Sequence, residues 1–176
     1  MFKKIALVVV VLVAGVLAYA ATRPDSLHVQ RAASIKAPPE KIVALIRDFH
    51  SWTAWSPYEK VDPAMKKTYS GAASGKGAVY EWDGNSQVGQ GRMEITEASP
   101  SRVTIKLDFL KPFEGHNVAA FTLTPQGDAT TVAWTMDGPT PYIVKVIGVF
   151  VDMDHMIGRD FETGLANLRA IAEKSK

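Results

Sequence analysis

The residues of this sequence best suited to chemistry are large aromatic side chains, spread over its middle and last third. Rigid rings around a concavity bind flat or apolar ligands, and an indole N–H or phenol O–H orients them. Methionines add an adaptable lining. Packing in an ordinary core is the competing interpretation for each residue. The candidates for lining a ligand-binding cavity are Trp52, Trp55, Tyr58, Tyr80, Trp82, Met93, Phe109, Phe121, Trp134, Met136, Phe150 and Met153.

One short segment combines carboxylates with an imidazole, namely Asp152, Asp154 and His155. An Asp–His pair can act in acid–base catalysis, and the three together supply part of a metal-binding triad. The other histidines are scattered singly, without HxH or HExxH spacing. Helix capping and solvated charges explain the segment more simply. The sequence therefore predicts no catalytic residue, no metal site and no cofactor.

Other motifs that carry chemistry in some proteins have structural interpretations here. Glu81 and Asp83 share a strand face, but both alternate away from Tyr80 and Trp82, so inward rings leave the acids in water. The glycines between residues 71 and 91 precede no helix, which favours hairpin turns and close strand approach over a phosphate loop. The sequence has no GxSxG motif and no cysteine, so nucleophilic catalysis has no candidate.

These side chains need elements to position them, and the last third of the chain predicts a long helix. Apolar residues recur there at steps of three and four, which places them on one helical stripe. The stripe consists of Val146, Phe150, Met153, Ile157, Phe161, Leu165, Leu168 and Ala172. Glycines weaken the helix, and we expect a bend between Gly148 and Asp154.

The middle of the chain has an apolar period of two, which is typical of strands. A first strand, residues 27–35, precedes two short helices, and short separators between the later strands imply an antiparallel meander. The later strands are predicted at residues 65–70, 77–83, 87–98, 101–110, 116–124 and 130–137. A curved sheet around the terminal helix would bury the apolar stripe.

The N-terminal segment, residues 1–22, has the character of a signal anchor or a signal peptide. Lys3 and Lys4 precede an uninterrupted apolar run, residues 5–21. As a helix this run is just long enough to span a bilayer, and the positive-inside rule then exports the domain. Alternatively, Ala18-Tyr19-Ala20 has the small-x-small form of a cleavage site. The domain is expected at the bacterial inner membrane facing the periplasm or cell exterior, or secreted after cleavage.

The charge balance excludes one class of partner. The net charge is +2, and without Lys3 and Lys4 the 20 basic residues become 18, equal to the 18 acidic ones. Nucleic-acid binding normally needs a clustered basic face. No nucleic-acid partner is therefore expected.

Four local strings are characteristic of a known family. They are IKAPPEKI at residues 35–42, WTAWSPY at 52–58, GKGAVYEW at 75–82 and IGRDFETGL at 157–165. The chain resembles the SRPBCC superfamily of START-like domains, and within it the bacterial polyketide cyclase/dehydrase and lipid-transport group. The resemblance implies an α+β helix-grip domain over residues 27–175, in which a curved seven-stranded antiparallel sheet wraps around a long C-terminal helix. It also implies an apolar cavity between sheet and helix, and it transfers no catalytic residue.

Three functions remain open at this point. The first is a membrane-tethered or exported domain that binds a hydrophobic small molecule or lipid, with residues 5–21 in the membrane. The second is a cyclase- or dehydratase-like enzyme that uses Tyr58, Tyr80 or His155 in the same cavity. The third is an interaction module whose exposed rings in residues 52–58 touch a bilayer or a protein partner.

Overall fold

The computed structural model of the protein describes residues 2–174. Met1 and residues 175 and 176, which include the start of the predicted N-terminal segment and the predicted end of the domain, lie outside the described residues. The elements in chain order are α1 (Phe2–Ala21), β1 (Ser26–Ile35), α2 (Pro39–Ile46), the 3-10 turn η1 (Phe49–Ser51), α3 (Trp52–Trp55), α4 (Tyr58–Val61), β2 (Lys66–Gly71), β3 (Ala78–Asp83), β4 (Gln90–Ala98), β5 (Arg102–Lys111), β6 (Gly115–Gln126), β7 (Ala129–Pro139), α5 (Tyr142–Ile147) and α6 (Met153–Lys174).

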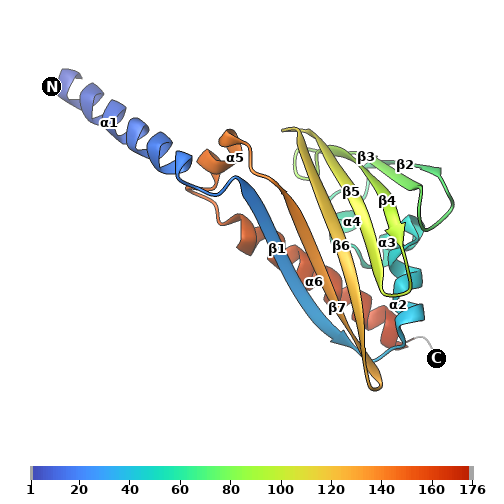
Figure 1. Ribbon diagram of the computed structural model, residues 1–176. Helices are drawn as coiled ribbons and strands as arrows, with labels where there is room; N and C mark the ends of the chain where they lie inside the picture. Colours follow the sequence, from blue (N-terminus) through green and yellow to red (C-terminus); the bar gives the residue numbers. More distant parts are fainter. Residues whose placement is uncertain (1, 175–176) are drawn as a thin grey trace.

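The seven strands form one antiparallel sheet in the order β1-β7-β6-β5-β4-β3-β2. Strands β2 to β7 are a meander, and β1 pairs with the free edge of β7 from Ser26 opposite Pro139 to Ile35 opposite Thr130. α6 lies along β1 and β7, and the sheet curves away from it toward β2 (Figure 1). The predicted helix-grip fold is confirmed, and the expected bend is the break between α5 and α6.

The curvature of the sheet has a local cause at β4. The pairing of β4 with β5 shifts register between Gln90 and Gly91 and again between Ile95 and Glu97, and such irregularities bend a strand. Gly91 pairs with Trp82, and a Cβ on Gly91 would collide with the indole ring. The ring therefore crosses β4 at the one position that has no side chain.

Arg31 on β1 fastens the first half of α6 to the sheet. Its Nη2 donates to Oδ2 of Asp154 at 2.9 Å, and its Nε donates to Oε1 of Glu162 at 3.0 Å. Oδ1 of Asp152 accepts the main-chain N–H of His155 at 3.0 Å, as a helix-capping residue does. Both aspartates of the Asp152–His155 segment thus have structural partners.

Helix α1 extends away from the rest of the molecule (Figure 1), and Ala20 is its only buried residue. Within residues 2–174, α1 is the one helix that is long and apolar enough to cross a membrane. Its exposed face consists of leucine, isoleucine and valine side chains. Such a face needs an apolar environment that the domain does not supply.

Candidate functional site

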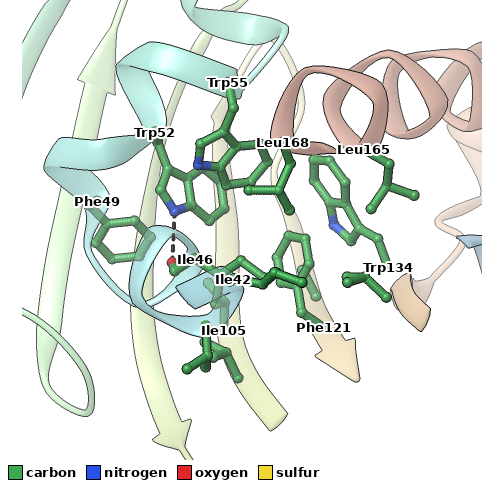
Figure 2. Close-up of a cluster of buried hydrophobic side chains, with 14 of the residues drawn as sticks. Ile42, Ile46, Phe49, Trp52, Trp55, Ile105, Phe121, Trp134, Leu165 and Leu168 are labelled. Carbon is green, nitrogen blue, oxygen red and sulfur yellow. Dashed lines mark hydrogen bonds between the residues drawn. The ribbon is translucent and has the colours of Figure 1, made fainter. Parts of the chain in front are cut away.

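An aromatic cluster fills the space between α2, α3, the sheet and α6 (Figure 2). The indole N–H of Trp52 donates to the carbonyl of Ile46 at 2.8 Å, and that of Trp55 to the carbonyl of Leu45 at 3.2 Å. The last carbonyls of a helix lack helical partners, so the end of α2 attracts these donors. Trp52 and Trp55 are 5% and 0% exposed. The prediction that this segment presents exposed rings to a bilayer or partner is therefore wrong for both tryptophans.

Trp134 connects the sheet to α6 within this cluster. Its ring stacks on that of Phe161, with centroids 4.1 Å apart and planes 7° from parallel. The ring of Phe121 lies on another side, with centroids 4.7 Å apart. Among residues 2–174, Nε1 of Trp134 is the only buried side-chain nitrogen or oxygen without a hydrogen-bond partner. The aromatic cluster therefore buries one donor that has no acceptor within the described part of the domain.

The packing between sheet and helix is not uniform along α6. On β5 the inward residues Val103 and Ile105 are fully buried, whereas Leu107 and Phe109 further along the strand are only half-buried. On α6 the same change separates buried Leu165 from half-buried Ile157. The sheet and helix thus close tightly around the second half of α6 and are more accessible at its beginning.

Two phenol–carboxylate pairs flank the aromatic cluster. The Tyr80 hydroxyl donates to Oε1 of Glu59 at 2.8 Å, and the other oxygen of Glu59 binds the Lys67 amino group. Tyr58, the residue before Glu59, interacts with Asp160 on α6. α4 therefore connects the sheet on one side to α6 on the other.

The electrostatics of these pairs follow from burial. The Tyr58 side chain is 36% exposed overall, but burial of its hydroxyl end and the nearby Asp160 carboxylate raise its pKa. Burial and the hydrogen bond to Glu59 raise the pKa of Tyr80 in the same direction. Burial also raises the pKa of the Asp160 carboxyl above its ordinary value. Both phenols are thus neutral at physiological pH and serve as hydrogen-bond donors, not as bases.

The structure brings most of the predicted lining residues together and leaves one apart. The residues that belong to one buried cluster or pack against it are Trp52, Trp55, Tyr80, Trp82, Met93, Phe109, Phe121, Trp134 and Met136. Tyr58 lies beside them through Asp160, and Met153 is half-buried at the start of α6. Phe150 lies in the turn between α5 and α6 and is 73% exposed, away from the others.

Two hollows on the surface lie elsewhere. One, of about 200 Å³, is bordered by residues 49–50, 69–73 and 78–79, including the stacked rings of His50 and Tyr69. The other, of about 310 Å³, lies between α2 and the turn after β4, with Glu40, Arg47 and Pro100 among its borders. None of the predicted lining residues borders either hollow. The predicted site is thus a packed apolar cluster in this structure.

Sequence reasoning missed three polar residues of the region, Glu59, Lys67 and Asp160. Lys67 does fall on the inward face by alternation, because it pairs with Trp82 across β2 and β3. Glu59 follows Tyr58 in a short helix that has no usable periodicity. Asp160 lies directly before Phe161 of the apolar stripe, where the sequence pattern indicates a solvent-facing charge.

Comparison with solved structures reveals the same fold in several bacterial proteins. Protein MLL2253 from Mesorhizobium loti has a TM-score of 0.62 at 17% identity, and the match covers 85% of this chain and 99% of that one. Protein CV1439 from Chromobacterium violaceum has a TM-score of 0.59 at 15% identity, covering 86% and 100%. The di-domain ARO/CYC StfQ from the steffimycin biosynthetic pathway has a TM-score of 0.63 at 9% identity, covering 85% of this chain and 51% of that one.

At sequence identities this low, the solved structures show that the chain shares their fold, and they show nothing about its function. A search of curated proteins finds no match to the chain. A family model does match, over residues 26–173, which is nearly the whole of the chain after α1. Its description is polyketide cyclase/dehydrase and lipid transport. The chain therefore belongs to the polyketide cyclase/dehydrase and lipid transport family of the SRPBCC superfamily.

Proposed function

We propose that this domain binds a hydrophobic small molecule or lipid between the sheet and α6, next to a membrane in which α1 is anchored. The observation that carries the proposal is the unpaired indole N–H of Trp134. A buried donor without an acceptor costs about 1–3 kcal/mol, and a ligand oxygen would recover that free energy. The preferred ligand is therefore apolar over most of its surface and carries at least one carbonyl, ether or hydroxyl oxygen.

The route to Trp134 starts at the first half of α6. Leu107, Phe109 and Ile157 are half-buried there, so these apolar side chains already meet solvent at one edge. Met93 and Met136 lie further in, and unbranched methionine side chains adjust readily to a ligand. Entry of a ligand at this edge would move flexible side chains and leave the closed end, around Leu165 and Leu168, unchanged.

Membrane tethering rests on α1. From Ile5 to Ala21 its surface is apolar on all sides and almost entirely unburied. Lys3 and Lys4 at its start favour an orientation with the domain outside the cytoplasm. The competing possibility is a cleaved signal that releases the domain. The mass of the mature protein in washed membranes, compared with the soluble fraction, distinguishes the two.

The ligand proposal is tested by native mass spectrometry of the full chain released from mild detergent. We expect bound apolar molecules on the wild type. They should be lost when Trp134 is replaced by benzothienylalanine, which keeps the ring shape but has no N–H. The matched control is the same replacement at Trp52, whose N–H already has a partner in Ile46. Repeated absence of bound molecules from the wild type, or equal retention by both variants, contradicts the proposal.

The alternative is a cyclase- or dehydratase-like enzyme in the same region. It is favoured by one observation, the raised pKa of Asp160 beside the Tyr58 phenol, because a carboxyl of raised pKa is a better proton donor. In an enzyme of this kind, molecules bound to Asp160→Asn protein would differ in mass from those bound to the wild type by one water. An identical set of bound molecules favours binding alone.

A further inference from the structure

An exposed apolar patch lies where α1 joins the domain. It consists of Tyr142 and Ile143 on α5, Phe150 and Val151 in the following turn, and Met156 on α6, and we call it the junction patch. Phe150 is 73% exposed and the others are between 38% and 49% exposed. Water-facing surfaces rarely carry five large apolar side chains in such a short stretch. Burial of the junction patch against an apolar partner would therefore be favourable.

The patch is free of exposed charge over most of its length. From Pro141 to Val151 the only charged residue is Lys145, which is buried and paired with Asp25. The first charged residue after the turn that carries Phe150 and Val151 is Asp152, which caps α6. A partner that fits this surface must therefore bind through apolar contact, without an ionic contribution from α5.

The position of α5 along α1 determines how deep the junction patch would lie in a bilayer that α1 spans. The Tyr142 hydroxyl donates to the main-chain carbonyl of Leu17 at 2.8 Å. Leu17 lies four residues before the end of α1 at Ala21, which is roughly 6 Å along the helix axis. The apolar run of α1, residues 5–21, is roughly 25 Å long as a helix, close to the ~30 Å thickness of the hydrocarbon core. When α1 spans the core, Tyr142 is held at the boundary between hydrocarbon and headgroups.

No flexible linker separates α1 from the domain. The four residues from Thr22 to Asp25 connect α1 to β1, whose first residue pairs with Pro139 at the end of β7. The main-chain N–H of Thr140 donates to the carbonyl of Asp25 at 2.8 Å. α5 thus starts directly beside the end of α1, and the two cannot separate without breaking these bonds.

We infer that the junction patch inserts into the outer leaflet of the bilayer that α1 spans, so that the domain rests on the membrane on its α5–α6 side. The inference rests on the proposed retention of α1 as an anchor. The partner is the lipid surface itself, and zwitterionic lipid suffices because the patch is uncharged. Aromatic residues such as Tyr142 favour this interfacial layer. Ile157, at the accessible end of the ligand region, follows Met156 of the patch on α6, so that end of the region would lie within one helical turn of the bilayer surface.

The test uses the full chain in phosphatidylcholine vesicles. Because the sequence has no cysteine, Ile143→Cys, Phe150→Cys and Asp128→Cys each provide one site for an environment-sensitive fluorophore. Asp128, in the exposed turn between β6 and β7, lies at the end of the sheet far from α1 (Figure 1) and is the control. Nitroxide lipids then quench each fluorophore, with the spin label either on the headgroup or deep in the acyl chain.

We expect headgroup nitroxides to remove most of the fluorescence at positions 143 and 150, deep acyl-chain nitroxides to remove less, and both to leave position 128 unchanged. Vesicles are first washed with carbonate, and only retained protein is measured, so failure of the anchor is detected separately. Equal quenching at all three positions, or none at 143 and 150, overturns the inference. Energy transfer between labelled copies without lipid quenching overturns it too, because the patch would then be covered by a second copy of the chain. Native mass spectrometry measures ligand retention in a separate experiment, so failure of the ligand proposal is distinguished from failure of this inference.

Discussion

The ring of Trp134 on β7 lies flat against the ring of Phe161 on α6, with centroids 4.1 Å apart. This stack joins β7, the strand next to the β1 edge of the sheet, to the C-terminal helix, and it is enclosed by the rings of Trp52, Trp55 and Phe121. Both stacked residues are almost completely buried. The grip of the sheet on α6 therefore depends on this pair more than on any exposed contact.

Replacement of the Phe161 ring tests that dependence. Phe161→Ala removes a buried ring and leaves Trp134 without its partner, so we expect the free energy of unfolding to fall by about 3–5 kcal/mol. Phe113→Ala removes a ring that is 50% exposed in the turn after β5. That control should change stability by less than about 0.5 kcal/mol. Denaturant unfolding of the full chain in mild detergent measures both, and similar losses in the two variants would contradict the assigned role of the stack.

Alanine substitutions at two glycines of α6, Gly164 and Gly158, should differ in their effect on stability. A Cβ at Gly164 would lie 2.7 Å from the rigid Trp134 ring and 3.2 Å from Pro57, so overpacking outweighs the helix propensity that alanine adds. We expect Gly164→Ala to destabilise the protein by about 1–2 kcal/mol. A Cβ at Gly158 would meet only the end of the flexible Arg31 side chain.

For Gly158→Ala we therefore expect a change within about 1 kcal/mol of zero, since Arg31 can move and alanine favours the helix. Thermal melts of the two variants under identical conditions make the comparison. An equal or larger loss at Gly158 would mean that the Arg31 contacts to Asp154 and Glu162 matter more than the aromatic core.

Alternation in the sequence predicted the sheet well because each strand has one wet and one dry face. Glu81 and Asp83 are exposed as the pattern indicates, and inward residues such as Ile105 and Phe121 are buried. Alternation assigns a face, however, and not a depth. Leu107 lies on the same inward face as Ile105 and is still only half-buried. The reason is that α6 packs along β1 and β7 and leaves this part of β5 less covered.

Two differences between the predictions and the structure have different physical causes. The spacing predicts Phe150 on the helical stripe, but the helix is interrupted between Ile147 and Met153, so the spacing loses its phase and the ring turns outward. The interaction-module hypothesis places the Trp52 ring at the surface, as part of the aromatic segment 52–58. The burial of that ring results from a hydrogen bond to the end of α2 that no local pattern indicates.

The ion pair between Arg31 and Asp154 predicts a pH dependence. The hydrogen bond from Arg31 lowers the pKa of Asp154 below its ordinary value of 3.8. A carboxyl whose pKa is lowered by folding stabilises the protein above its unfolded pKa, and that contribution is lost as the pH falls through the folded value. Asp154→Asn should therefore be less stable than the wild type at neutral pH, and the difference should shrink as the pH falls below 3.8 and disappear once the carboxyl is protonated in the folded protein.

The control for this prediction is the same substitution in an Arg31→Gln background. Without the guanidinium, Asp154→Asn should give a much smaller pH-dependent difference, because the largest cause of the shift is absent. Unfolding midpoints measured across this pH range for the four proteins complete the cycle. A difference that persists at low pH, or one that survives the loss of Arg31 undiminished, would assign the effect to another group.

The unpaired N–H of Trp134 leads to the sharpest prediction, because stability and binding should change in opposite directions. With benzothienylalanine at position 134, the ligand-free protein loses a buried donor that has no acceptor. We expect its free energy of unfolding to rise by up to about 1–3 kcal/mol while ligand retention falls. The same analogue at Trp52 breaks the bond to Ile46 and leaves a buried carbonyl unpaired, so stability should fall by about 1 kcal/mol or more and ligand retention should not change. Melting of delipidated protein, paired with native mass spectrometry, reads both quantities. A loss of stability at position 134 would show that the N–H has an acceptor in the folded protein, and Trp134 would then be only a packing residue.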